Sequence, residues 1–260
     1  MAAAMVENQL CREVSANPGP DLRTNAPPYL LLDPLPGAFL VNNLAIFDLD
    51  HTLLDGDSDY LWGRFLVEQG MVDGDSYERK NHEFYLAYQA GTLDIDAFAA
   101  FSLKPLTQYE PEQLYALRQR FVAEKIEPCV SAGTPDLLRR HREQGDTLII
   151  TTATNRFITE PIAALLGVPN LLATDPEIID GRYTGRLSGH ANFREGKVLR
   201  LRAWLELHRI LPTHSTCYSD SHNDLPLLEF ADTAVAVDPD PTLLAEAQRR
   251  GWAVISLKAA

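Results

Sequence analysis

The chain has 260 residues, and its 23 Lys and Arg against 36 Asp and Glu give a formal net charge of −13. Nucleic acids are held mainly by basic side chains on phosphates, and no basic run offsets this excess, so we expect no nucleic-acid partner. A content of 45% hydrophobic and 23% charged residues is typical of a soluble globular protein. Three widely spaced Cys favour a reducing compartment, and no apolar run approaches the roughly 18 residues that cross a bilayer. We therefore expect a cytoplasmic protein without membrane contact.

Residues 1–42 differ from the rest of the chain in their high proline content and lack of apolar periodicity. Six prolines interrupt this segment, and no apolar period survives between them. We expect a flexible N-terminal extension here. The remaining chain is predicted to form a core domain from residues 43–55 and 132–260, interrupted by a cap domain over residues 56–131.

Short apolar runs that end abruptly in polar residues recur from Leu44 onward, as is typical of buried parallel strands. Helical stretches lie between most of them. The predicted strands are 44–47, 147–150, 171–173, 215–218 and 233–237, and the predicted helices are 134–144, 156–166, 196–208, 225–230 and 241–250. This alternation predicts an α/β fold with a doubly wound, parallel, Rossmann-like sheet, whose sites lie at the carboxyl ends of the strands.

The segment between the first two core strands is predicted to be entirely helical. Apolar residues such as Leu61, Phe65 and Leu66 recur at helical spacing and would face the inside of a small bundle. The predicted helices are 59–69, 76–90, 94–101 and 111–126. We expect this insertion to cover the sheet as a cap. Further along, an Asp180-Gly181 turn between short alternating runs predicts a β-hairpin over residues 178–184.

The strongest chemical signal is the sequence Asp48-Leu49-Asp50-His51-Thr52, which directly follows the first core strand. Two carboxylates two residues apart leave the sheet together and can share one divalent cation and one phosphoryl group. Like charges this close need a partner. The alternative interpretation is an Asp-rich turn in which Thr52 caps the next segment.

Two further residues follow the same logic. Thr152 ends the second strand ahead of a helix, so its hydroxyl and the amide of Ala153 form a natural phosphate cradle. Lys197 opens the helix 196–208 and can pair with a phosphate and with a carboxylate nucleophile. Taken alone, Thr152 reads equally as a helix cap and Lys197 as a solvated surface charge.

The stretch Ser219-Asp220-Ser221-His222-Asn223-Asp224 follows another apolar strand. It offers two carboxylates beside an Asn, and hard oxygen ligands of this type suit Mg²⁺. The alternative is an Asx-rich turn that caps the helix 225–230. The seven His show no spacing typical of a zinc site.

Together these motifs resemble the four motifs of the haloacid dehalogenase superfamily, in its Mg²⁺-dependent phosphatase branch, over essentially residues 44–256. The helical insertion looks like the C1 cap of the phosphoserine-phosphatase-like subgroup, subfamily IB. The stretch from Asp48 to Tyr60 is similar to proteobacterial members of which several are regarded as histidinol-phosphate phosphatases.

This resemblance implies roles for the motif residues. Asp48 would be the nucleophile that forms an aspartyl-phosphate, and Asp50 would act as general acid and then as general base. The resemblance places Mg²⁺ on Asp48, on the backbone carbonyl of Asp50 and on Asp220, with Asp224 acting through a water. The phosphate contacts it implies are Thr152, Ala153, Lys197 and Asn223.

The substrate is expected to be a small phosphorylated metabolite with a cationic leaving group. In the resembling phosphoserine phosphatases a Glu stands nine residues after the nucleophile and takes the substrate ammonium; Asp57 stands there in this chain. Such enzymes also present a cap Arg to the substrate carboxylate, whereas residues 91–106 contain Lys104 and no Arg. Histidinol phosphate has an ammonium and an imidazole but no carboxylate, so the departure favours it and would place the enzyme in histidine biosynthesis.

Charge and aromatic content of the cap agree with a cationic substrate. Residues 56–135 contain 7 Lys and Arg against 13 Asp and Glu, a net charge of −6. Asp57, Asp59 or Glu83 would receive the positive end, unless these acids only solvate helix faces. The aromatic candidates for stacking, which at helical spacing are also candidate core residues, are Tyr60, Trp62, Phe84, Tyr85 and Tyr88.

Other functions stay open at this point. Within the same branch, the alternatives are a phosphoserine phosphatase and a broader small-molecule phosphatase. Outside it, a phospho-accepting signalling domain shares the sheet type but has no helical insertion after its first strand, and a non-catalytic binding protein would not need the complete set of motifs. Either a monomer or a homodimer is compatible with the sequence.

Overall fold

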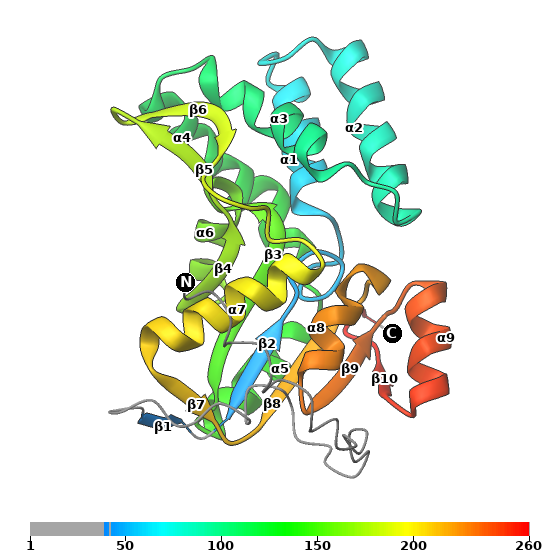
Figure 1. The fold of residues 1–260 in the computed structure, drawn as a ribbon. Helices are drawn as coiled ribbons and strands as arrows, with labels where there is room; N and C mark the ends of the chain where they lie inside the picture. The colour runs from blue at the N-terminus through cyan, green and yellow to red at the C-terminus, as the bar shows by residue number, and fades with distance from the viewer. Residues whose placement is uncertain (1–38, 42, 260) are drawn as a thin grey trace, which may run out of the picture.

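Six parallel strands form the central sheet (Figure 1). The computed structural model describes residues 39–41 and 43–259. In spatial order the strands are β10 (Ala253–Ile255), β9 (Thr233–Val237), β8 (Ser215–Ser219), β2 (Leu44–Phe47), β3 (Thr147–Asn155) and β4 (Asn170–Thr174). The chain moves from β2 to β3 and β4 on one side, then returns to β8 on the other side. The strand order therefore reverses beside β2, and open α/β sheets bind their ligands at such a reversal.

Helices cover both faces of the sheet, as the alternating pattern predicts. All four residues of β2 are buried: Ala45 and Phe47 belong to one apolar cluster, and Leu44 and Ile46 to another. On the first face lie α5 (Thr134–Glu143) and α6 (Arg156–Leu165); on the second lie α7 (Glu195–His208), α8 (Leu225–Phe230) and α9 (Pro241–Arg250). The predicted doubly wound α/β fold is confirmed.

The helical insertion lies between β2 and β3 and stands over one end of the sheet (Figure 1). Its helices are α1 (Ser58–Glu68), α2 (Gly74–Gln89), α3 (Ile95–Leu103), η2 (Lys104–Thr107), α4 (Pro111–Phe121), η3 (Val122–Ile126) and η4 (Glu127–Cys129). The chain enters and leaves this cap side by side: Leu54 forms a β-bridge with Val130, and the Asp55 amide donates to the Cys129 carbonyl at 2.7 Å.

The base of the cap shares an apolar cluster with the core. Trp62 of α1 is buried, and its ring centroid lies 5.1 Å from that of Phe121 and 5.6 Å from that of Phe157. Phe157 belongs to α6 of the core, so side chains of the two parts are packed into one continuous interior. Large buried aromatic rings contribute strongly to stability, so this contact fixes the base of the cap firmly.

A hairpin from the core also touches the cap. It consists of β5 (Pro176–Ile179) and β6 (Arg182–Leu187), which confirms the predicted hairpin. Asp180 and Gly181 at its tip both have positive φ, as a two-residue hairpin turn requires. Arg182 forms an ion pair of 2.6 Å with Glu110 at the start of α4.

Three short strands were not expected from the sequence. β10 extends the sheet at its edge, and β1 (Phe39–Val41) pairs in parallel with β7 (Ile210–Pro212). β1 falls inside the segment predicted as a flexible extension; the rest of that segment lies outside the described residues. Each of these strands has only three residues, which is too short for an apolar period to be read.

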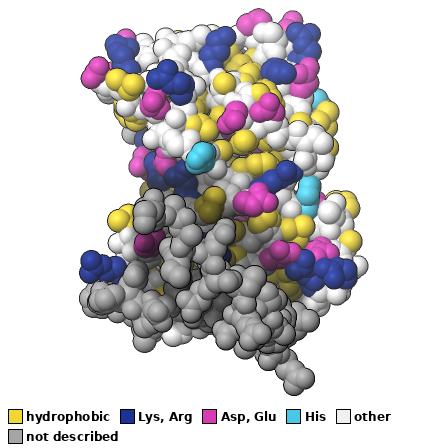
Figure 2. Space-filling model, viewed as in Figure 1, with side chains coloured by type: hydrophobic (Ala, Val, Ile, Leu, Met, Phe, Trp, Pro, Cys, Tyr) yellow, Lys and Arg dark blue, Asp and Glu magenta, His cyan; other side chains and the backbone are white. Residues whose placement is uncertain are grey.

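Charged side chains are mixed over the face shown in Figure 2, where Lys and Arg are interspersed with Asp and Glu. The coloured residues of this view form no continuous basic surface. Within the part of the chain that the structure describes, no helix is long and apolar enough to cross a membrane.

Candidate active site

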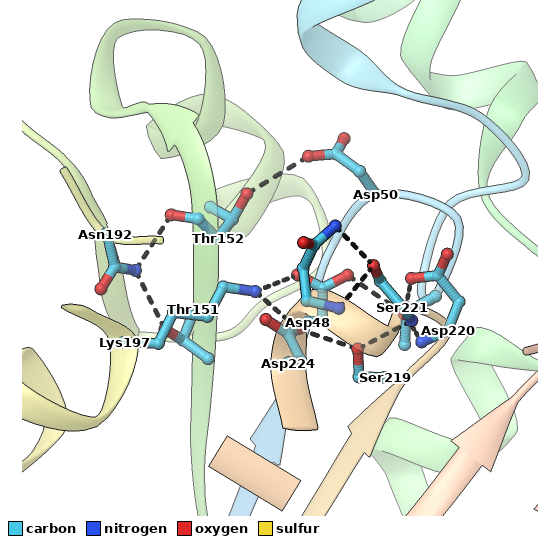
Figure 3. Close-up of polar contacts among 12 residues, drawn as sticks. Asp48, Asp50, Thr151, Thr152, Asn192, Lys197, Ser219, Asp220, Ser221 and Asp224 are labelled. Carbon is cyan, nitrogen blue, oxygen red and sulfur yellow. Dashed lines mark hydrogen bonds and ion pairs between the residues drawn. The ribbon is translucent and has the colours of Figure 1, made fainter. Parts of the chain in front are cut away.

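A buried lysine joins two carboxylates at the end of the central strands (Figure 3). Lys197 Nζ lies 2.7 Å from Asp48 Oδ1 and 2.7 Å from Asp224 Oδ2, and all three side chains are at least nine-tenths buried. Burial alone would lower the pKa of Lys197, but the charges of Asp224 and Asp48 outweigh it and raise that pKa. The Lys197 side chain is therefore a permanent cation beside Asp48.

Asp48 and Asp220 meet at one hydroxyl group. Thr52 Oγ1 lies 3.2 Å from Asp48 Oδ2 and 3.1 Å from Asp220 Oδ1, so the two carboxylates face the same point from β2 and β8. Burial, opposed by Lys197 and assisted by the nearby carboxylates, raises the pKa of Asp48 to about 7. Burial and then the charge of Asp48 raise the pKa of Asp220 well above its usual range. A cation between the two carboxylates would relieve this repulsion.

This donor set fits Mg²⁺. Among the described residues, no group of three or more His, Cys, Asp or Glu is arranged to hold a metal. Mg²⁺ does not need one, because it commonly takes one or two carboxylates and completes its shell with water and substrate phosphate. Asp48 and Asp220 supply those two carboxylates, whereas the Asp224 carboxylate is held by Lys197 and by Ser219 Oγ at 2.8 Å.

The Asp50 side chain points away from Asp48, towards the end of β3 (Figure 3). Its carboxylate accepts hydrogen bonds from the Ser58 amide at 2.7 Å, from Thr154 Oγ1 at 2.8 Å and from Thr152 Oγ1 at 3.2 Å. The same three donors hold the carboxyl group in one orientation above the pocket.

Thr154 was not singled out from the sequence, although a signal was present. Successive residues of a strand alternate between its two faces, so Thr152 and Thr154 must point the same way. A second residue missed is Asn192, whose Nδ2 donates to Thr151 Oγ1 and the Thr152 carbonyl at 3.0 Å and to a β4 carbonyl. Asn192 ties the loop before α7 to the strand ends, and no periodicity in the sequence indicates this.

A pocket opens between these strand ends and the cap. The motif residues that line it are Asp48, Asp50, Thr152, Ala153, Lys197 and Asp224. From the cap, Asp57 and Asp59 line the same pocket. Lys197 is the one basic side chain among the lining residues that the structure describes. Lys197 is already paired with two carboxylates of the core. Because the charged residues that the cap contributes are Asp57 and Asp59, the cap side of the pocket is lined by acidic residues.

The two cap acids differ in their environment. Asp57 is the N-cap of α1, and its Oδ1 accepts from the amides of Asp59 and Tyr60, each at 2.9 Å. Asp59 is 8% exposed and accepts from Ser102 Oγ at 3.1 Å. Burial, followed by the charge of Asp57, raises the pKa of Asp59 to about 8. Burial and the charge of Asp50 raise the pKa of Asp57 to about 6.

Of the other cap residues predicted to contact the substrate, some line the pocket and some do not. The aromatic side chains that line the pocket are Tyr60, Phe84, Tyr85, Tyr88, Phe98 and Phe193. Trp62, in contrast, is buried in the cluster at the base of the cap. Glu83 is exposed, pairs with Lys80 at 3.0 Å, and does not line this pocket. Neither residue is therefore placed to meet a ligand there.

Asn223 has both ends of its amide engaged. Its Oδ1 accepts from Arg194 Nε at 3.1 Å and Nη2 at 3.0 Å. Its Nδ2 donates to the Tyr88 carbonyl at 3.3 Å and to Ser221 Oγ at 3.2 Å. The predicted contact with phosphate stays a prediction, and Asn223 joins the core to the cap in this structure.

Comparison with known proteins gives the family. The model of the haloacid dehalogenase-like hydrolases matches residues 45–229, which include all the motifs described above. The chain is a haloacid dehalogenase-like hydrolase. This membership confirms the resemblance inferred from the motifs.

Two curated relatives of this hydrolase have named activities. A histidinol-phosphatase of Neisseria meningitidis serogroup C is 43% identical over 222 residues, which cover 84% of this chain and 100% of the relative. A phosphoserine phosphatase of Mycobacterium tuberculosis is 32% identical over 213 residues, which cover 81% of this chain and 69% of the relative. The hydrolase is thus an enzyme whose named relatives are phosphatases.

Solved structures show the same fold. A protein of unknown function from Bordetella pertussis Tohama I is 43% identical, with a TM-score of 0.79 over 84% of this chain and 99% of the other. A phosphoserine phosphatase with a phospho-aspartyl intermediate analogue superposes with a TM-score of 0.62 over 84% and 94% of the two chains. Its identity is 16%, so this likeness concerns the fold alone.

Proposed function

We propose that this hydrolase is a Mg²⁺-dependent phosphomonoesterase that forms an aspartyl-phosphate on Asp48. A carboxylate oxygen of Asp48 attacks phosphorus in line, the bond to the leaving oxygen breaks, and Asp50 gives that oxygen a proton. Asp50 then takes a proton from the water that attacks the phosphoenzyme, which releases phosphate and restores Asp48. The Thr154 hydroxyl, which donates to Asp50 Oδ2 at 2.8 Å, supports both roles because it keeps the carboxyl group in position.

The charge of the phosphoryl group is offset from several sides. Lys197 would bind a phosphoryl oxygen, and its 2.7 Å ion pair with Asp48 supports this role. We assign the Thr152 hydroxyl and the Ala153 amide to the same group. Mg²⁺ on Asp48, Asp220 and the Asp50 carbonyl would supply further positive charge to the phosphoryl oxygens.

For the substrate, we propose L-histidinol phosphate. The carrying observation is the cap side of the pocket, where Asp57 and Asp59 stand among aromatic rings without a basic cap residue. An ammonium is attracted to carboxylates and to aromatic faces, and an imidazole can stack on such rings. A substrate carboxylate would find no basic cap side chain there among the lining residues that the structure describes. The name of the Neisseria relative agrees with this choice.

Phosphoserine is the second candidate. The named phosphoserine phosphatase among the relatives supports it, as does the carboxylate of Asp57 nine residues after Asp48. Lys104 is the one basic residue of the stretch 91–106, and it does not line the pocket. The phosphoserine carboxylate would therefore have no basic cap partner among the lining residues that the structure describes.

A substrate panel tests both proposals. Purified enzyme with Mg²⁺ is offered histidinol phosphate, phosphoserine and sugar phosphates, and released phosphate is measured. We expect histidinol phosphate to have the highest kcat/KM, and a chelator to abolish turnover until Mg²⁺ is restored. Preference for phosphoserine would refute the assignment of the cap pocket, and no release from any phosphomonoester would refute the phosphatase.

The nucleophile is tested by Asp48→Asn. The amide is isosteric but cannot form the phosphoenzyme, so we expect kcat to fall by more than about a thousandfold. Circular dichroism and thermal unfolding check that the fold is kept. A variant with more than one-tenth of the wild-type rate would remove Asp48 from this role.

We further place the enzyme in the cytoplasm and in histidine biosynthesis. Expression in a bacterial strain that lacks its histidinol phosphatase should restore growth without histidine, and the Asp48→Asn variant is the matched control. Growth restored equally by both would contradict the assignment. Light scattering after gel filtration decides between the monomer and the homodimer.

A further inference from the structure

One core arginine, Arg194, contacts the cap at residues 88–91, which we call the tip of the cap. Arg194 stands at the N-terminal end of α7, three residues before Lys197, with a φ of 51°. Its Nη2 donates to the Gly91 carbonyl at 2.5 Å, and its Nε and Nη2 donate to Asn223 Oδ1. A left-handed conformation is costly for a residue with a side chain, so it persists only where the surroundings impose it. The contacts of the guanidinium group provide such a constraint.

The contacted segment, residues 88–91, runs from the last turn of α2 into the turn that follows it. The last carbonyls of a helix lack partners within the helix, and basic side chains commonly bind them. α2 has no basic residue in its own last turn. Arg194 supplies that charge from the core, while the Asn223 amide donates to the Tyr88 carbonyl. His222 lies so close that a Cβ on Gly91 would be 2.8 Å from His222 Nε2.

The cap is thus held by two different kinds of contact. At its base, the rings of Trp62 and Phe157 belong to a shared apolar interior. At its tip, the contacts of Arg194 and Asn223 are polar and partly solvent-accessible. Polar contacts exchange readily with water, whereas the apolar base cannot open without exposing its rings. The tip is therefore the end that can separate from the core.

The tip also carries the wall of the pocket. Tyr85 and Tyr88 of α2 line the pocket, and Tyr88 is the first residue of the contacted segment. Phe193, the neighbour of Arg194, lines it from the core side. Fixing Gly91 therefore fixes the aromatic wall relative to Asp48 and Lys197.

We propose that Arg194 is a positioning residue that holds the tip of the cap closed over the bound substrate. It acts through the Gly91 carbonyl and through Asn223, and it does not touch the reacting atoms. Release of this clamp separates the Tyr85 and Tyr88 wall from the strand ends, so the guanidinium sets the affinity for the leaving group rather than the rate of phosphoryl transfer.

The decisive variant is Arg194→Ala, which removes the guanidinium and leaves the backbone requirement unchanged. In the metal-free protein without substrate, we expect amide hydrogen exchange over residues 84–95 to accelerate by roughly tenfold or more, and exchange in α1 and α4 to stay as in the wild type. This measurement does not depend on the proposed phosphatase function. Arg139→Ala, on an exposed helix face, is the matched control and should leave exchange unchanged.

The kinetic half rests on the proposed function and uses whichever phosphomonoester the wild type hydrolyses. We expect KM to rise by roughly tenfold and kcat to stay within about threefold for Arg194→Ala. Arg194→Lys keeps the positive charge but loses the planar set of guanidinium donors. Its KM should therefore lie between those of the wild type and Arg194→Ala. If Arg194→Ala does not fold, Arg194→Gly relaxes the backbone and gives the same readouts. Unchanged exchange at the tip, or a loss of kcat at constant KM, would overturn the clamp.

Discussion

Asp59 is a buried carboxyl group on the cap side of the pocket. Its carboxyl group is almost fully buried in the pocket wall, where the hydroxyl of Ser102 is its hydrogen-bond donor. Burial raises its folded pKa from 3.8 to about 8, so the folded state binds a proton that the unfolded state releases above about pH 4. A cationic group bound beside Asp59 would stabilise its carboxylate form and release this proton.

Replacement of Asp59 by Asn should therefore change how stability depends on pH. Because the folded pKa lies above the unfolded one, the wild type loses stability as pH rises from about 4 to about 8, and the loss is then constant. The free energy of unfolding of Asp59→Asn relative to the wild type should rise over the same window, by at least about 1 kcal/mol. Thermal unfolding of the metal-free protein from pH 4.5 to 9 measures this difference.

The control for this experiment is Asp136→Asn on the exposed face of α5. The hydrogen bond and charge of Arg139 lower the pKa of Asp136 below its usual 3.8, so its titration falls largely below pH 4.5 and Asp136→Asn should run parallel to the wild type over the measured range. A flat difference between Asp59→Asn and the wild type would show that the folded protein leaves the Asp59 carboxyl as solvated as the unfolded chain does.

At the scale of the element, α1 links the catalytic loop to the cap. Its N-cap is Asp57, and the Ser58 amide in its first turn donates to Asp50. The free amides at a helix N-terminus favour negative charge. The start of α1 thus holds Asp50, the proposed general acid, and presents its own N-cap Asp57 to the pocket.

The two roles of Asp57 can be separated by substitution. Asparagine is as good an N-cap as aspartate, whereas alanine loses the cap and costs about 1 kcal/mol. Because burial raises the pKa of Asp57 to about 6, we expect Asp57→Asn to keep or raise the Tm at pH 7 and to raise KM for a cationic substrate by roughly tenfold. Asp57→Ala should have a lower Tm than Asp57→Asn. Steady-state kinetics and thermal unfolding of both variants check this. An unchanged KM in both would limit Asp57 to capping.

Much of this arrangement was predictable from the sequence because parallel strands end at one edge. The apolar runs before Asp48, Thr152 and Asp220 located that edge and the residues on it. The cap–core contacts were not predictable, because the partners of Arg194 and Asn223 are backbone carbonyls of a distant helix and leave no residue pattern. Burial likewise decided that Trp62 packs in the interior while its neighbours line the pocket.

At the scale of the whole molecule, cap and core are one cooperative unit. The cluster around Trp62 contains residues of both, so the cap has no apolar interior separate from that of the core. Domains that share a core unfold together, whereas separate cores permit separate transitions.

Trp62→Ala tests this unity. Loss of a buried aromatic ring should cost about 3–5 kcal/mol and lower Tm for cap and core together in a single transition. Calorimetry should give equal calorimetric and van't Hoff enthalpies for wild type and variant. Leu207→Ala, at a side chain that is 78% exposed, is the control and should change stability by less than about 0.5 kcal/mol. Two resolved transitions would contradict the shared interior.

The paired linkers of the cap, joined at Leu54 and Val130, have an evolutionary consequence. Because entry and exit are hydrogen-bonded neighbours, insertions of very different length fit the same gap without altering the distance between β2 and β3. Replacement or enlargement of the insert therefore leaves the motif residues at the strand ends in place, provided that the start of α1 keeps the hydrogen bond from the Ser58 amide to Asp50. Substrate range can therefore change by exchange of the insert between Leu54 and Val130. Each new insert must bring apolar side chains that pack beside Phe157.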